Sequence, residues 1–298
     1  MVSADGSSVG GSRRTQHLLV TLLGDYWRGR QDPIPSAALV AALSEFEVSP
    51  EGARSALSRL ARNELLDRSK VGRKTYYQLT ERSQRMFEEG AAKIFSFGVG
   101  SETWSRRWSL VAFSVPEGRR ELRHALRARL SWWGFVPLYD GLWVSPHPRL
   151  AEAGRALAEL GIDNHAVFEA DALAGLGTET VARAWDLPRV AALYREYVTT
   201  FEPFVGRAAA SLAPARAMVV RTRAMDSWRT FPRVDPDLPA EFLPPGFSRC
   251  RAREVFEHLW SALGPPAEKH FTRLVERCAF PSPRARRQDL RPQGGASR

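Results

Sequence analysis

The stretch SPEGARSALSRLARNELLDRSKVGRKTYYQLT, residues 49–80, decides how the N-terminal part of this chain folds. Ser49 can accept a hydrogen bond from the free N–H groups of a first helical turn, and Pro50 suits the first helical position. Glu51 complements the positive end of the helix dipole. The sequence therefore predicts a helix that begins at Pro50.

The predicted helix has one apolar side and one polar side. Its apolar residues recur at helical spacing: Ala53, Ala56, Leu57, Leu60 and Ala61. The other side carries Arg54, Ser55, Ser58, Arg59 and Arg62. Small hydroxyl side chains allow close approach to DNA, and arginine can hold a phosphate or the edge of a guanine in the major groove. The helix is therefore a candidate DNA-reading helix, although a solvated basic face is the alternative.

After Leu66 the sequence alternates as a strand does, turns at Val71-Gly72 and alternates again to Leu79, which predicts a short β-hairpin with a basic tip. The helix and the hairpin together give the candidate DNA-binding residues: Ser49, Arg54, Ser55, Ser58, Arg59, Arg62, Lys70, Arg73, Lys74 and Tyr76. Two further helices are expected before this stretch, at residues 16–27 and, capped by Ser36, at residues 37–46. Helix, helix, reading helix and hairpin follow the plan of a winged helix-turn-helix.

The middle of the chain shows a different pattern. A further helix is expected at residues 81–90 and a domain boundary near residue 100. The next elements are a strand, a helix, two strands, a helix and a strand, at residues 108–115, 117–130, 135–139, 142–145, 149–160 and 164–169. This βαββαβ order suggests a ferredoxin-like domain.

The remaining sequence is mainly helical. Helices are expected within residues 178–212, at 216–230 and, after a proline-rich link at 231–246, at 250–263. We therefore expect an α+β multidomain chain with five parts: a disordered leader at 1–13, a winged helix-turn-helix domain at 14–98, a ferredoxin-like, Cas2-like domain at 99–176, a helical C-terminal domain at 177–280, and a disordered basic tail at 281–298.

Composition and charge set the expected partner and compartment. The 43 lysines and arginines exceed the 33 acidic residues, giving a net charge of +10. This charge favours an anionic partner, although an arginine-rich composition also arises in high-GC genomes. No apolar run is long enough for a membrane span and no secretion signal is evident, so we expect a cytoplasmic protein. Cys250 and Cys278 are expected to be free thiols, with one disulfide left open.

Seven blocks along the chain make it resemble the PaaX family of phenylacetic-acid-degradation repressors. They are LLVTLLGDYW at 18–27, SPEGARSALSRLARNELL at 49–66, VGRKTYYQLT at 71–80, RWSLVAFSVPEGRRELRHALR at 107–127, GLWVSP at 141–146, WDLPRVAALYREYV at 185–198 and FPRVDPDLPAEFLPPGF at 231–247. The resemblance covers nearly all of residues 15–265. Arg54, Ser55, Ser58 and Arg59 match the family's reading-helix block, where Ala53 replaces the more usual valine.

The resemblance implies a dimeric, cytoplasmic transcriptional regulator that associates with the nucleoid when it is bound to double-stranded operator DNA. It implies repression of aromatic catabolic genes and release by an aryl-CoA thioester effector such as phenylacetyl-CoA, with no cofactor. The residues that contact the effector are unknown. A DNA-binding regulator with a different effector, or with none, is the alternative.

The middle domain also looks like the Cas2 nuclease fold, which makes a metal-dependent nuclease the remote alternative. In that family an aspartate at the end of the first strand helps to hold a divalent metal, whereas this strand ends Phe113-Ser114-Val115-Pro116. No phosphate-binding loop, nucleophile elbow or zinc-protease motif is present, so we expect no enzyme and no metal site. Two sets of side chains are alternative ligand contacts or ordinary surface and core: Arg119, Arg120, Arg123 and Arg127; and Trp132, Trp133, Trp143 and Trp185.

Overall fold

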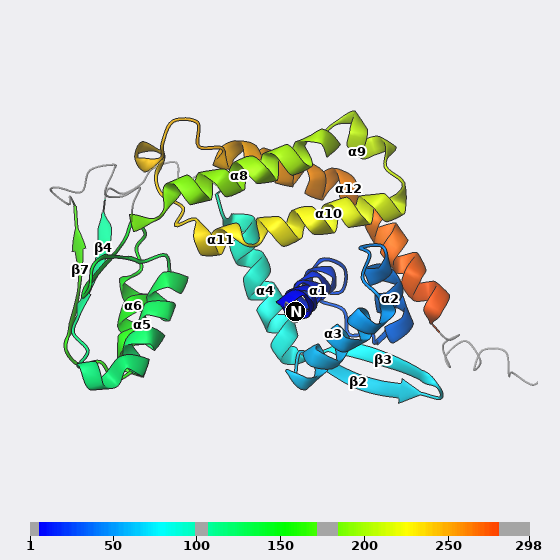
Figure 1. The fold of residues 1–298 in the computed structure, drawn as a ribbon, viewed down its shortest axis with the longest axis horizontal. Helices are drawn as coiled ribbons and strands as arrows, with labels where there is room; N and C mark the ends of the chain where they lie inside the picture. The colour runs from blue at the N-terminus through cyan, green and yellow to red at the C-terminus, as the bar shows by residue number, and fades with distance from the viewer. Residues whose placement is uncertain (1–5, 99–106, 172–183, 280–298) are drawn as a thin grey trace, which may run out of the picture. The chain divides into compact units, whose positions relative to one another are not determined.

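The computed structural model describes residues 6–98, 107–171 and 184–279 (Figure 1). The chain divides into two compact units. The first unit combines Met1–Ala91, Gly206–Asp226 and Leu259–Arg298, and the second combines Ala92–Val205 and Ser227–His258. Each unit therefore draws on segments that lie far apart in the sequence. The division into five parts expected from the sequence stays a prediction.

The first unit contains the elements expected before residue 98 and one short strand, β1, that was not expected. They are α1 (Gly6–Tyr26), β1 (Ile34–Pro35), α2 (Ser36–Ser44), α3 (Pro50–Arg62), β2 (Leu66–Val71), β3 (Lys74–Leu79) and the first turns of α4 (Glu81–Ser96). The strands form an antiparallel sheet in the order β1-β3-β2. The predicted start of a helix at Pro50 and the predicted hairpin are confirmed. The turn lies one residue later than predicted, at Gly72-Arg73, where Gly72 has a φ of +59°.

Among the helices before residue 98, two predicted starts differ from the structure. Helix α1 begins at Gly6 instead of Gln16, so residues 6–13 are helical although their glycine and serine content indicated disorder. Extending a helix whose later turns are already packed costs much less than starting a new one. Ser36 is the first residue of α2 and does not cap it; Pro35, which pairs with β3, holds the N-cap position, and no side chain caps the helix.

A single apolar core holds the first unit together. Helices α1, α2 and α3 contribute fully buried leucines, among them Leu19, Leu39 and Leu57. Two helices from much later in the chain complete this core, α10 (Pro214–Trp228) and α12 (Arg249–Cys278). Burying one such leucine side chain stabilises the fold by about 2 kcal/mol. The late helices are therefore structural parts of the unit that carries α3 and the hairpin.

Helix α12 runs far beyond its predicted end at Leu263. It continues through Pro265 and Pro266, although proline removes a helical hydrogen bond and normally ends a helix. The turns that follow are held by tertiary packing, since Phe271 is buried and stacks on Tyr26 with ring centroids 5.0 Å apart. The prediction was wrong here because the local proline signal was outweighed by packing in the core of the first unit.

The second unit contains a four-stranded antiparallel sheet. Its elements follow the predicted βαββαβ order: β4 (Trp108–Phe113), α5 (Arg120–Trp132), β5 (Val136–Tyr139), β6 (Leu142–Ser145), α6 (Leu150–Glu159) and β7 (His165–Ala170). The strand order is β5-β6-β4-β7, as in ferredoxin-like domains. Helices α5 and α6 cover one face of the sheet (Figure 1). The predicted topology of the middle domain is confirmed.

Helices and short turns complete the second unit: α8 (Leu187–Phe201), a 3-10 turn at Glu202–Phe204, α11 (Phe231–Val234), a 3-10 turn at Ala240–Phe242 and the start of α12. The short helix α9 (Arg207–Ser211) belongs to the first unit. Residues 178–183, predicted as helical, and the predicted tail at 281–298 lie outside the described residues. The predicted mainly helical C-terminal part is confirmed for the residues that the structure describes.

A buried ion pair lies inside the helical part of the second unit. Arg249 Nε lies 3.0 Å from Asp235 Oδ2, and the Asp235 side chain has no exposed surface. The Tyr194 hydroxyl donates a hydrogen bond of 2.6 Å to Asp235. Arg249 also donates to Asp237 Oδ1 and to the carbonyl of Leu238. One guanidinium therefore ties the start of α12 to the segment after α11.

Candidate nucleic-acid interface

Ser49 fixes the start of α3. Its side-chain oxygen accepts a hydrogen bond of 3.1 Å from the backbone N–H of Gly52, so it caps the helix as predicted. The apolar side of α3, including Ala53, Ala56 and Leu57, is buried in the core of the first unit. This packing turns the opposite side of α3 toward solvent.

Replacing Ser49 with alanine is expected to lower the free energy of unfolding by about 1 kcal/mol, because the Gly52 N–H loses its acceptor. Urea unfolding followed by circular dichroism measures this change. The matched control is Ser58→Ala in the exposed middle of α3, which should change stability by less than about 0.5 kcal/mol. Equal effects of the two substitutions would show that the cap contributes nothing.

The exposed side of α3 brings the predicted DNA-binding residues together. Arg54, Ser55, Ser58 and Arg62 are exposed and Arg59 is partly buried. Arg59 Nη1 donates a hydrogen bond of 2.9 Å to Ser55 Oγ, one helical turn away. Arg54 lies 3.7 Å from Glu51, and both side chains are largely exposed, so this pair contributes little to stability. The face presents three guanidinium groups and two hydroxyls.

The hairpin separates the other predicted residues. Lys70 and Arg73 are exposed, whereas Tyr76 is buried between its strand partners Ser69 and Pro35. Lys74 is partly buried and donates a hydrogen bond of 3.1 Å to the carbonyl of Cys278, at the end of α12. The DNA-binding roles of all four residues stay predictions.

The structure adds one basic residue to this surface. Arg68 is exposed and lies two residues before Lys70 on β2, so both side chains share one face of the hairpin. The alternation of β2 in the sequence could have shown this pairing. The contact between Lys74 and α12 had no such signal, because it joins residues 204 positions apart. We name Arg68, Lys70 and Arg73 the wing cations.

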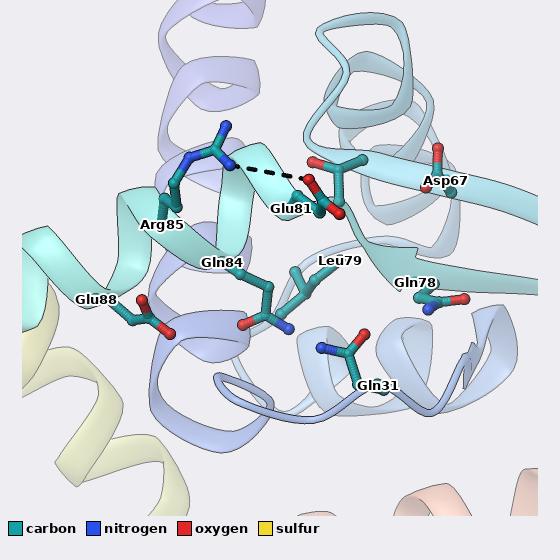
Figure 2. A pocket seen from close by; sticks show the side chains of 9 residues that line it. Gln31, Asp67, Gln78, Leu79, Glu81, Gln84, Arg85 and Glu88 are labelled. Carbon is teal, nitrogen blue, oxygen red and sulfur yellow. Dashed lines mark ion pairs between the residues drawn. The ribbon is translucent and has the colours of Figure 1, made fainter.

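A polar pocket of about 420 Å³ lies elsewhere in the first unit, at the base of the hairpin and the start of α4 (Figure 2). Gln84 spans its floor, accepting a hydrogen bond from the Gly29 N–H and donating one to the Arg30 carbonyl. The charged lining residues are Asp67, Glu81, Arg85 and Glu88. This excess of carboxylates makes the pocket a poor place for an anionic ligand.

No helix among the described residues is long and apolar enough to cross a membrane. Within the same residues no three histidine, cysteine or acidic side chains are grouped as metal ligands would be. Strand β4 ends at Phe113, which pairs with His165 of β7. Cys250 and Cys278 are free thiols.

The arginine and tryptophan sets noted in the sequence are separated by the structure. Arg123 donates to the Val115 carbonyl at 2.6 Å and Arg127 pairs with Asp140 at 2.5 Å, while Arg119 and Arg120 are exposed. Trp143 and Trp185 are buried in the apolar cores on the two faces of the sheet. Trp132 is 49% exposed, and Trp133 is partly buried beside it. Of the four tryptophans, only Trp132 and Trp133 have surface that a ligand could reach.

Comparison with known proteins gives consistent matches along the chain. Residues 14–83 match a PaaX-like protein family, residues 101–182 match the PaaX protein central Cas2-like domain, and residues 185–273 match the PaaX-like protein C-terminal domain. The transcriptional repressor PaaX of Escherichia coli K12 is 29% identical over 259 residues, which are 84% of this chain and 80% of that protein.

A solved structure of an uncharacterised protein from Mycobacterium tuberculosis has a similar fold. The TM-score is 0.55 with 19% sequence identity, and the match covers 87% of this chain and 97% of the other. The three family matches occur in one order along the chain and agree with the match to the E. coli repressor. The chain belongs to the PaaX family.

Proposed function

We propose that this protein is a transcriptional repressor of phenylacetate-type aromatic catabolic genes that binds operator DNA through α3 and the wing cations. The observation that carries the proposal is the similarity to the E. coli repressor over 84% of the chain, together with the family match that includes all of α3 and the hairpin. Helices α1, α2 and α3 with the β2–β3 hairpin then form a winged helix-turn-helix. No catalytic step is assigned to the protein.

The exposed side of α3 has the chemistry of a major-groove reader. Arg54, Arg59 and Arg62 can hold phosphates or guanine edges, and Ser55 and Ser58 allow close approach. The hydrogen bond from Arg59 to Ser55 holds the guanidinium along the helix surface, where it is already oriented. The wing cations are placed to hold phosphates beside the groove.

We propose further that the repressor acts as a homodimer. A two-fold dimer places two copies of α3 in successive major grooves of one DNA face, so the half-sites should lie one or two helical turns apart, at about 10 to 10.5 bp per turn. A footprint of two symmetric protected segments at this spacing supports the dimer. A single protected segment contradicts it.

An aryl-CoA thioester such as phenylacetyl-CoA is the proposed effector. A ligand shifts the repressor off DNA only if it binds the DNA-free arrangement more tightly than the DNA-bound one. Thermodynamic linkage then requires that operator DNA weaken thioester binding by the same factor.

The proposal is tested by fluorescence anisotropy with a labelled fragment from the protein's own promoter region, at two salt concentrations, with and without phenylacetyl-CoA. We expect tight, salt-sensitive binding that exceeds binding to random DNA at least about a thousandfold and that the thioester abolishes. Operator binding that ignores the thioester supports the alternative, a regulator with a different effector or none. Equal affinity for random DNA contradicts the repressor.

A further inference from the structure

Three cations of the second unit gather around two tryptophans. Lys93 of α4 lies over the Trp132 ring, with Nζ 4.1 Å from the ring centroid, and donates a hydrogen bond of 3.3 Å to the Trp132 carbonyl. Arg233 of α11 approaches the same ring at 5.7 Å, and Arg149 lies 5.8 Å from the Trp133 ring. We name these five residues the basic aromatic cluster.

The ends of two helices build this cluster. Helix α5 ends at Trp132, and Gly134, with a φ of +82°, turns the chain back into the sheet. Helix α6 starts directly after Arg149, without a side-chain cap. The free N–H groups of its first turn add partial positive charge next to the Arg149 guanidinium. Both tryptophans therefore lie beside an electropositive surface whose position is set by the end of α5 and the start of α6.

Acidic side chains do not balance this charge. Among the described residues, only Glu152 forms an ion pair with a cation of the cluster, 3.1 Å from Arg149. Partial burial, followed by the charges of Arg149 and Arg233, lowers the pKa of the Lys93 amine. Arg149 Nε is buried and has no hydrogen-bond partner among the described residues. An anion at this place would relieve the repulsion and supply acceptors.

The tryptophans indicate what kind of anion fits. Trp132 is 49% exposed, which is unusual for so large an apolar ring and leaves part of the ring accessible to a ligand. A planar base can stack on such a ring while its phosphates reach the surrounding cations. The carboxylate-rich pocket of the first unit offers neither feature.

We propose that the basic aromatic cluster binds a phosphorylated nucleotide, with Lys93, Arg149 and Arg233 holding its phosphates and Trp132 stacking on its base. Coenzyme A carries such a nucleotide, so the cluster is the place where the CoA portion of the proposed thioester effector binds. This assignment rests on the proposed function only for the identity of the ligand. The site itself is defined by the cluster.

Isothermal titration calorimetry of the full chain with free coenzyme A tests the proposal, with inorganic phosphate as a second titrant. We expect Lys93→Gln and Arg233→Gln each to weaken coenzyme A binding about tenfold, and Trp132→Ala to weaken it by a similar factor. The matched control is Arg195→Gln on the exposed side of α8 in the same unit, which should bind as the unchanged protein does.

Four results test this site and distinguish its failure from failure of the proposed function. Cluster-dependent binding of coenzyme A without release of DNA by phenylacetyl-CoA supports the site and contradicts the effector. If the thioester releases DNA but the Lys93→Gln/Arg233→Gln double variant binds coenzyme A as tightly as the unchanged protein, the site is overturned. The site is also overturned if inorganic phosphate binds as tightly as coenzyme A. It is overturned as well if the cluster variants lose affinity for operator DNA but retain their affinity for coenzyme A.

Discussion

Arg249→Ala is expected to lower the free energy of unfolding by about 3 to 5 kcal/mol, the largest effect of any single substitution considered. The change leaves Asp235 as a fully buried carboxylate whose only ionic partner among the described residues is gone. Burial raises the pKa of the Asp235 carboxyl, and the Arg249 guanidinium lowers it. Without Arg249 the pKa of Asp235 must rise further.

The pH dependence follows from this direction. A carboxyl with a raised pKa in the folded state binds a proton more readily there than in the unfolded chain, so its protonation favours folding. The stability lost in Arg249→Ala should therefore be partly recovered as the pH falls through the raised pKa of Asp235. Urea unfolding at neutral and at mildly acidic pH measures both the loss and its recovery.

Arg251→Ala is the matched control. Arg251 belongs to the same helix and also contacts two carboxylates, Glu202 at 2.5 Å and Glu254 at 2.7 Å, but its side chain is about half exposed. Exposed ion pairs contribute at most about 1 kcal/mol. If the Arg249→Ala and Arg251→Ala variants have the same free energy of unfolding, then the burial of Asp235 does not determine how much stability is lost when its partner is removed.

Removing all three wing cations, in Arg68→Ala/Lys70→Ala/Arg73→Ala, should weaken operator binding by about a hundredfold or more at roughly 0.1 M salt. Each cation that holds a phosphate displaces a counterion, so the slope of log affinity against log salt should become smaller by about 2.7. Binding to random DNA should weaken by a similar factor, because phosphate contacts carry no sequence information. Anisotropy across a salt series gives both quantities.

The control for this triple variant removes the same charge elsewhere. Arg119, Arg120 and Arg155 are exposed on the second unit, and replacing all three with alanine lowers the net charge equally. We expect this variant to bind the operator with nearly unchanged affinity and salt slope. An equal loss in the two triple variants would mean that overall charge, rather than the wing, attracts DNA.

Local sequence signals were sufficient to predict α3 and the hairpin. The cap at Ser49, the proline at position 50 and the alternation after Leu66 each act within a few residues, and the structure has the elements that they predict. The βαββαβ order of the middle domain could be read for the same reason. Periodicity and turn residues are properties of short segments, and these elements depend on little else.

The features that could not be predicted from the sequence depend on packing between residues far apart in the chain. By its alternation Tyr76 shares a strand face with Lys74 and Gln78, which are partly buried, yet Tyr76 is buried where it pairs with Pro35 of β1. Helix α12 passes two prolines because Phe271 is held in a distant core, and its last turn reaches Lys74. Trp132 and Trp143 look alike as residues, but only the fold shows which of them remains at the surface.

The composition of the first unit has a consequence for synthesis on the ribosome. Its core includes Phe271 and Leu274, which are translated among the last of the described residues. When α3 and the hairpin have been translated, the apolar surfaces that α10 and α12 will cover are therefore still exposed. The nascent chain then depends on chaperones for longer than an autonomous N-terminal domain would. Truncated products should aggregate or be degraded instead of occupying the operator as partly active repressors.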